Sequence, residues 1–230
     1  MSELILAQDE KEVNSDGIRF AGWSFKPGEI TPSELLVLTA IGAFVNGKNE
    51  CWPSVPTLAK MSKVSKRAAQ YCIRELAKKK IIKVTEQESS KTGNKSNLYK
   101  ITVPRNAEWQ KLKVIKLILG IENISRTEVL VLLAMVDHIF SGRYSNNFAF
   151  ARKFTISQGD VAGKTGLLRD RVNLAVSSLS RKNLSLPEVG NDEWVALKVD
   201  KESEKGKKLI YQLVGSEKAI RQLVELIDPY

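Results

Sequence analysis

The chain has 230 residues, enough for one large domain or two small ones, and its 43% apolar and 27% charged residues are ordinary for a folded protein. Its 36 Lys and Arg exceed its 26 Asp and Glu and leave a net charge of +10, which predicts a polyanionic partner, with nucleic acid ahead of anionic lipid. The longest apolar run, 129–136, is far too short for a membrane-spanning helix, and the N-terminal residues lack the pattern of a secretory signal. We therefore expect a cytoplasmic protein without membrane association.

Cysteine and histidine, which carry much of enzyme and metal chemistry, are scarce in this sequence. Cys51 and Cys72 form no C-x-x-C pair and are too few for a disulfide framework, and His138 is the only histidine. These counts argue against a metal centre and against Ser-His-Asp chemistry. We expect no catalytic residue, no metal ligand and no cofactor.

Residues 1–30 are predicted to form an acidic N-terminal arm, because they carry six acidic side chains and only three basic ones. Phe20, Trp23 and Phe25 in the second half of this arm are expected to anchor it to the first domain.

An internal repeat follows the arm. Thr31–Glu34 and Ser125–Glu128 are both capping boxes in front of an apolar run, and they lie 94 residues apart. Further matches share a constant offset of 103: Leu58-Ala59 with Val161-Ala162, Ile73 with Val176, Leu76 with Leu179, and Lys80-Ile81 with Asn183-Leu184. We interpret 31–104 and 123–215 as two copies of one unit.

The first copy, 31–104, is predicted to contain three helices and a β-hairpin. Helices are expected at about 32–44, after Ser54 and after Ser65, and strands at 81–85 and 97–103 around a polar loop. This is the order of a winged helix-turn-helix, in which the third helix enters the major groove of DNA and the hairpin, or wing, contacts the backbone or minor groove.

The outward face of the third predicted helix carries residue types that bind DNA. Arg can pair with guanine and Gln with adenine, Lys mostly positions phosphate, and amides that follow a Ser N-cap can meet a phosphate. This copy is strongly basic, with 13 basic and 5 acidic residues. Its predicted DNA-binding residues are Ser65, Lys66, Arg67, Gln70, Tyr71 and Arg74 on the helix and Lys91, Asn94, Lys95 and Asn97 on the wing.

Residues 105–122 are predicted to form a helical linker, because Trp109, Leu112, Ile115 and Leu119 recur near helical spacing. A linker packed on both copies would fix their mutual orientation. Both third helices could then address one face of a duplex about 34 Å, or one turn, apart.

The second copy, 123–215, is predicted to repeat the order, with helices at about 126–140, after Ser157 and at 168–182, and a hairpin between 184 and 214. It is less basic, with 14 basic and 10 acidic residues, which predicts a weaker electrostatic contact; protein contact or dimerisation is the alternative for this copy. Its predicted DNA-binding residues are Lys164, Arg169, Arg171, Asn173, Ser177 and Arg181, with Lys205, Lys207 and Lys208 on the wing.

Residues 216–230 are predicted to form a C-terminal helix with a narrow apolar stripe that includes Ile220, Leu223 and Ile227. Docking on its own domain and pairing with a second copy of the chain, as in a homodimer, are equally consistent with this stripe.

Gly159–Thr165 resembles a nucleotide-binding P-loop but departs from it in two ways. Three residues, not four, separate its first Gly from the Gly-Lys-Thr triplet, and the segment coincides with the second predicted helix of its copy. The sequence therefore argues against nucleotide hydrolysis.

The first copy resembles the helix-turn-helix domain that is common in phage and plasmid replication proteins. The resemblance covers about 70 residues and rests on Cys51-Trp-Pro-Ser54, Thr57-Leu-Ala59, Val64-Ser-Lys-Arg67, Ile73-Arg-Glu-Leu76, Lys80-Ile-Ile82 and Asn97-Leu-Tyr99. Two winged helices in tandem also resemble plasmid replication initiators, which bind repeated origin sequences with both domains and often repress their own promoter. The resemblance implies that Lys66, Arg67, Gln70 and Arg74 contact one half-site and that Arg169, Arg171, Asn173 and Arg181 contact the other. Host replication proteins are the further partners that it implies.

The sequence thus predicts a mainly α fold with β-hairpin wings (α+β), made of two tandem winged helix-turn-helix domains and a helical linker. The expected function is non-enzymatic, sequence-specific binding of double-stranded DNA at a plasmid or phage origin. A transcriptional repressor of plasmid or phage genes is the first alternative, and a tandem winged-helix scaffold that binds proteins is the second.

Overall fold

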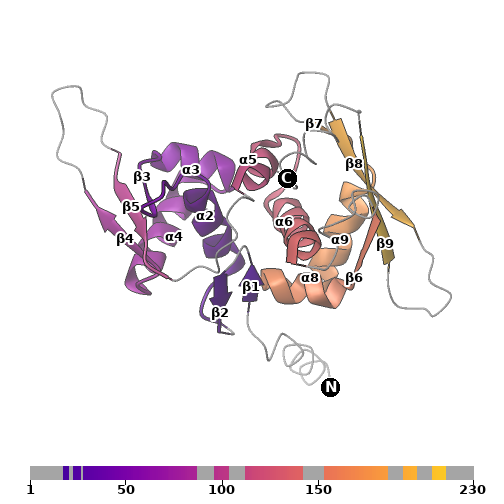
Figure 1. Ribbon diagram of the computed structural model, residues 1–230, viewed down its shortest axis with the longest axis horizontal. Helices are drawn as coiled ribbons and strands as arrows, with labels where there is room; N and C mark the ends of the chain where they lie inside the picture. Colours follow the sequence, from indigo (N-terminus) through magenta and orange to yellow (C-terminus); the bar gives the residue numbers. More distant parts are fainter. Residues whose placement is uncertain are drawn as a thin grey trace.

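The structure is a computed structural model that describes residues 18–20, 23–26, 28–86, 96–103, 112–141, 153–185, 194–200 and 209–215. These residues form two units of helices and small antiparallel sheets on either side of a central group of helices (Figure 1). The predicted α+β fold with two tandem winged helix-turn-helix units is confirmed.

The first unit has three helices and a three-stranded antiparallel sheet in the order β3-β5-β4. Each helix begins after a hydroxyl side chain that accepts a hydrogen bond from a backbone amide of the first turn, as the capping pattern predicts. The short strand β3 was not predicted. The elements are α2 (Pro32–Gly42), β3 (Glu50–Cys51), α3 (Val55–Met61), α4 (Lys66–Lys78), β4 (Ile82–Thr85) and β5 (Leu98–Ile101).

The second unit repeats this order and has a four-stranded antiparallel sheet, β6-β9-β8-β7. The long strands β8 and β9 form the predicted hairpin, whereas β6 and β7 were not predicted. The tip of the hairpin lies outside the described residues. The elements are α6 (Arg126–Ser141), β6 (Lys153–Ile156), α8 (Gln158–Thr165), α9 (Arg169–Leu179), β7 (Leu184–Ser185), β8 (Trp194–Asp200) and β9 (Leu209–Gly215).

The two sheets place a buried tyrosine at the same position. Tyr99 on β5 lies opposite Cys51 on β3, and Tyr211 on β9 lies opposite Phe154 on β6, with the rings of Tyr211 and Phe154 stacked 5.4 Å apart. Burial raises the pKa of both hydroxyl groups, and that of Tyr211 reaches about 12. Since Cys51 and Phe154 also differ by 103 positions, the repeat extends into the sheets.

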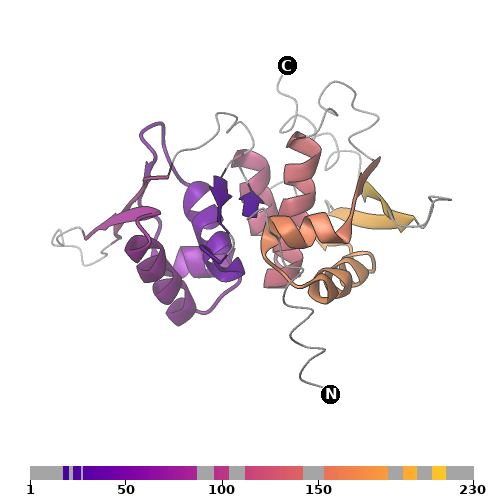
Figure 2. The same cartoon turned by 90° about the horizontal axis from the view of Figure 1, so that it is seen from below.

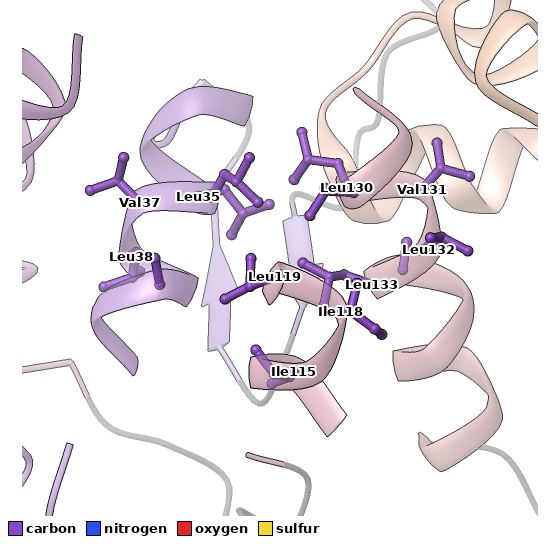
Figure 3. Close-up of a cluster of buried hydrophobic side chains, with 14 of the residues drawn as sticks. Leu35, Val37, Leu38, Ile115, Ile118, Leu119, Leu130, Val131, Leu132 and Leu133 are labelled. Atoms are coloured by element: carbon purple, nitrogen blue, oxygen red, sulfur yellow. The ribbon is translucent and has the colours of Figure 1, made fainter. Parts of the chain in front are cut away.

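A helix of the linker segment joins the two units through a continuous apolar core. Helix α5 (Leu112–Gly120) packs against α2 of the first unit and α6 of the second. Figure 3 shows Leu35, Val37 and Leu38 of α2 on one side of α5 and Leu130–Leu133 of α6 on the other, with Ile115, Ile118 and Leu119 of α5 in the same cluster. An interface of this kind holds two units in a fixed orientation, unlike a small polar one.

The central position of α2 and α6 explains their composition. Every described residue from Glu34 to Gly42 and from Glu128 to Met135 is buried, because each helix packs against its own unit and against the linker helix. The near-continuous apolar runs in the sequence therefore mark helices that are covered on several sides.

The N-terminal arm reaches the second unit as well as the first. Its described part is a hairpin of β1 (Ile18–Phe20) and β2 (Trp23–Phe25), in which Trp23 and Phe25 are buried in the common core. Strand β1 lies against α8 of the second unit, as Figure 1 shows. The sequence predicted an anchor on the first unit and did not predict this contact.

The remaining sequence predictions concern the P-loop-like segment, the C-terminal helix, membrane spans and metal sites. Gly159–Thr165 lies within α8, so the P-loop-like residues form a helix rather than the loop in front of one, as expected. The C-terminal helix predicted for 216–230 and Trp109 lie outside the described residues. Within the described ranges, no helix is long and apolar enough to cross a membrane, and no cluster of His, Cys, Asp and Glu could hold a metal ion.

Candidate nucleic-acid interface

Helices α3 and α4 form the helix-turn-helix of the first unit. Ser54 caps α3 and Ser65 caps α4, where the hydroxyl of Ser65 accepts a hydrogen bond from the amide of Ala68 at 3.2 Å. Lys63, in the turn between the helices, has a φ of 51°, the left-handed conformation that ends many helices. The turn thus reverses the chain sharply enough to project α4 away from α3.

Helix α4 is strongly amphipathic, as the sequence predicted. Ala69, Cys72, Ile73 and Leu76 are buried against the unit, whereas the predicted DNA-binding residues Ser65, Lys66, Arg67, Gln70, Tyr71 and Arg74 are all exposed. Arg67, Tyr71 and Arg74 stand at i, i+4 and i+7 and form the outermost ridge of the helix. Within the described part of the chain, neither arginine of this ridge forms an ion pair, so both guanidinium groups face solvent.

The wing of the first unit is described only at its base. Lys91, Asn94 and Lys95 lie outside the described residues, and Asn97, just before β5, is half-buried. The side chain of Asn97 opposes the effect of burial on the pKa of the nearby Tyr99 hydroxyl, for which the described residues provide no hydrogen-bond partner. The contact of Asn97 with DNA stays a prediction.

Cations that were not among the predicted DNA-binding residues also border α4. Lys78 and Lys80 at the end of the helix and Lys83 on β4 are exposed. Lys78 makes an exposed i,i+3 ion pair with Glu75, at 3.2 Å. An exposed pair of this kind contributes little to stability and leaves the ammonium group accessible. The cluster Lys78-Lys79-Lys80 in the sequence was a usable signal for these positions.

The second unit presents α9 in the same way. Val172, Ala175, Val176 and Leu179 are buried, whereas the predicted contacts Arg169, Arg171, Ser177 and Arg181 are exposed and Asn173 is half-buried. Lys205, Lys207 and Lys208 on the wing lie outside the described residues. Leu168 occupies the N-cap position and makes no capping hydrogen bond, which costs about 1 kcal/mol relative to a Ser cap.

The structure does not bring Lys164 to this surface. Its ammonium group lies 2.6 Å from the carboxylate of Asp137 on α6, and only 18% of its side chain is exposed. Lys164 therefore ties α8 to α6 and has its charge neutralised within the protein, so we leave it out of the proposed interface.

The third helix of each unit, α4 in the first and α9 in the second, is called the recognition helix below. An ion pair that is present in both units fixes the C-terminal end of each recognition helix. Glu34 accepts a hydrogen bond from the Thr31 amide in its capping box and pairs with Lys79 at the end of α4, at 2.8 Å. Glu128 does the same with the Ser125 amide and with Lys182 after α9, at 2.7 Å. Both glutamates are only 3% exposed. One carboxylate in each unit thus caps the first helix and holds the C-terminal end of the recognition helix.

The electrostatics of this pair are clearest at Glu128. Burial alone would raise the pKa of its carboxyl, but hydrogen bonds from Lys182 and from Ser125 outweigh it and lower the pKa to about 2. The charged form is thus the one that the second unit stabilises.

The two turns before the recognition helices share their backbone geometry and differ in sequence. Gly166 in the second unit has a φ of 68° and stands 103 positions after Lys63.

Replacing Gly166 with alanine should destabilise the protein by about 1 kcal/mol, because a Cβ is disfavoured in the left-handed region of φ. Urea denaturation would measure the loss, and Gly47→Ala, where a Cβ meets nothing within 4 Å and φ is ordinary, should change little. Equal stability of both variants would contradict the argument.

The two recognition helices lie on the same side of the molecule. Helices α4 and α9 are both on the lower side in Figure 2, separated by the central helices, and the strand pairs β4-β5 and β8-β9 lie at opposite ends. The guanidinium of Arg126, the first residue of α6, donates to the hydroxyl of Ser33, the second residue of α2, at 3.0 Å. Arg126 and Ser33 thus occupy nearly equivalent positions at the start of the first helix of each unit. Such a contact is expected when the two units are related by an approximate two-fold axis.

Comparison with known proteins identifies part of the chain. Residues 28–82 match the helix-turn-helix domain family. The first unit is therefore a helix-turn-helix DNA-binding domain, a fold that is typically non-enzymatic. A crystal structure of RctB domains 2-3 is similar over 82% of this chain and 84% of that chain, with a TM-score of 0.40 and 11% sequence identity. No curated protein matches the sequence.

Proposed function

We propose that the chain binds a specific double-stranded DNA site with both winged helices at once and acts as a replication initiator of a plasmid or phage. The observation that carries the DNA part of the proposal is the ridge of α4, where Arg67 and Arg74 are exposed on a helix-turn-helix and unpaired within the described residues. The other part of the proposal, a role in the initiation of replication, rests on the resemblance of the sequence to replication proteins.

The charge arrangement around α4 supports the choice of DNA. Three acidic side chains of the first unit form ion pairs: Glu34 is buried with Lys79, Glu75 on α4 itself pairs with Lys78, and Glu50 on β3 pairs with Lys100 at 2.9 Å. Lys100 also holds the pKa of Glu50 below its usual value. The exposed cations are left to produce a positive surface, which attracts phosphate and steers association with a duplex.

The shared core supports simultaneous use of both units. Since α2, α5 and α6 pack into one cluster, α4 and α9 are held at a fixed separation on one side of the molecule. An approximate two-fold relation between them predicts two half-sites in inverted orientation, about one helical turn apart. A single chain would thus cover a site of the kind that usually needs a dimer.

Footprinting on DNA that flanks the chain's own gene tests the proposal. We expect protection of two adjacent major grooves per bound chain, and several copies of the site in a row would favour the initiator. A single inverted site over the promoter would instead favour the repressor. Absence of any preferred site, with affinity equal to that for random DNA, would overturn sequence-specific binding and leave a protein-binding scaffold.

A further inference from the structure

The outermost ridge of α9 differs in chemistry from that of α4. At three positions related by the offset of 103, α4 carries Arg67, Tyr71 and Arg74, and α9 carries Asp170, Leu174 and Ser177. All six side chains are exposed. Two positive charges and an aromatic ring on one helix are thus replaced by a negative charge, an aliphatic side chain and a hydroxyl on the other.

These positions are equivalent in space as well as in sequence. Each helix buries the same four positions, follows a left-handed turn at the same position, and ends with a lysine bound to the buried glutamate of its own unit. A duplex that lies along both helices therefore meets the α4 ridge in one major groove and the α9 ridge in the other. The chemical difference becomes a difference in base recognition.

Leu174 is the unusual member of the α9 ridge. It is 65% exposed at the point of the helix that lies farthest from the core, and Leu168 at the start of the helix is 56% exposed. Cations stand beside these leucines at Arg169 and Arg171. In the major groove, the apolar feature between the two rows of phosphates is the 5-methyl group of thymine.

Asp170 limits which bases can stand in the half-site that α9 contacts. A carboxylate accepts hydrogen bonds and is repelled by the acceptor groups N7 and O6 of guanine, whereas the N4 amino group of cytosine is a donor in the major groove. Within the described residues Asp170 forms no ion pair, so its charge is available at the ridge. In contrast, Arg67 and Gln70 on α4 suit the acceptors of guanine and the N6/N7 pair of adenine.

We propose that the two recognition helices read half-sites of different composition, with α9 specific for a half-site in which Leu174 contacts a thymine methyl group and Asp170 accepts from the N4 group of cytosine. This inference rests on the proposed DNA-binding function. The site is therefore asymmetric in sequence even though its halves are inverted, and a single chain binds it in one direction only.

The same residues could in principle form a protein-docking face, but their arrangement favours DNA. On the ridge, Leu174 lies between Asp170 and Ser177, which are both exposed and polar. A docking face would place several apolar residues together, whereas a leucine among polar and cationic side chains matches an isolated methyl group in a groove lined with phosphate.

Replacing single thymines with deoxyuridine tests the proposal directly, because this change removes only the 5-methyl group. The selected site would be scanned with the full chain and with Leu174→Ala, whose exposed position makes a folding defect unexpected. For the unmodified chain we expect a 3- to 10-fold loss of affinity at one or two thymines, all in the half-site contacted by α9. For the Leu174→Ala variant, replacing the same thymines with deoxyuridine should cause no further loss of affinity.

The outcomes separate this inference from the proposed function. Tyr71→Ala is the matched control on α4, and it should leave the sensitivity to deoxyuridine in the α9 half-site unchanged. If the chain protects two half-sites but Leu174→Ala and deoxyuridine act independently, the inference is overturned and the proposed function stands. If α9 leaves no footprint and Leu174→Ala does not alter DNA affinity, α9 does not contact the duplex and the inference is also overturned. If the unmodified chain shows no sequence-specific binding to DNA, the proposed function itself is overturned.

Discussion

Replacing Lys66, Arg67 and Arg74 together with alanine should weaken binding to the specific site by about 10³-fold. A residue that reads a base contributes about 1 to 3 kcal/mol, and each lost phosphate contact lowers the dependence on salt. The three side chains are exposed on α4 and make no ion pair within the described residues, so the change should leave the fold intact. Titration of labelled DNA at several salt concentrations measures both the affinity and the salt dependence.

Single variants then separate base contacts from phosphate contacts. If Arg67 reads a base, Arg67→Ala should weaken specific binding by about 1 to 3 kcal/mol and leave binding to random DNA nearly unchanged. If it touches only phosphate, the loss should be similar on every sequence. Lys48→Ala, in the exposed loop between α2 and β3, is the control for loss of one positive charge outside α4. An unchanged affinity of the triple variant would remove α4 from the interface.

The parts of the fold that the sequence predicted are those with a strong local signal. The capping boxes at Thr31 and Ser125 begin α2 and α6, and Ser54, Ser65 and Ser157 cap the helices that were expected after them. Side-chain burial on α4 follows its sequence periodicity. These features depend on residues within a few positions of one another, so a single sequence is enough to find them.

Features that depend on distant residues escaped prediction. Strand β3 has two residues and exists because β5, almost 50 positions later, pairs with it. The contact of β1 (Ile18–Phe20) with α8 (Gln158–Thr165) joins elements that lie far apart in the sequence. Lys164 carries a positive charge near a recognition helix, yet its proximity to Asp137 is visible only once α6 and α8 are packed together. Local charge alone therefore overestimated the surface that is free to bind DNA.

The lysines that hold the recognition helices are an intermediate case. Lys79 and Lys182 differ by the same 103 positions as the rest of the repeat, and Glu34 and Glu128 by 94, so both members of each pair were present in the alignment of the two copies. What the sequence lacked was a reason to connect a capping glutamate with a lysine more than 40 positions later. The packing of α2 against α4, and of α6 against α9, supplies this connection.

Replacing Glu128 with glutamine should destabilise the protein by about 3 kcal/mol at neutral pH. The carboxyl has a pKa of about 2 in the folded protein, below its ordinary value of 4.5, and a difference of this size corresponds to about 3 kcal/mol. Because the folded pKa is lowered, this stability is present above pH 4.5 and is lost as the pH falls towards 2. Glutamine cannot ionise and leaves Lys182 without its counter-ion, so the variant should lack this part of the pH dependence.

Urea denaturation of the two proteins between pH 7 and pH 2.5 measures the effect. The gap in unfolding free energy should be widest at neutral pH and should close progressively below pH 4.5, as the unmodified chain loses the advantage of its charged carboxylate. Glu75→Gln is the matched control, because Glu75 pairs with the exposed Lys78 and a surface pair contributes well under 1 kcal/mol. A gap that stays constant with pH would mean that Glu128 acts through its shape and hydrogen bonds, and not through its charge. The recognition helix of the second unit would then not be held by an ion pair.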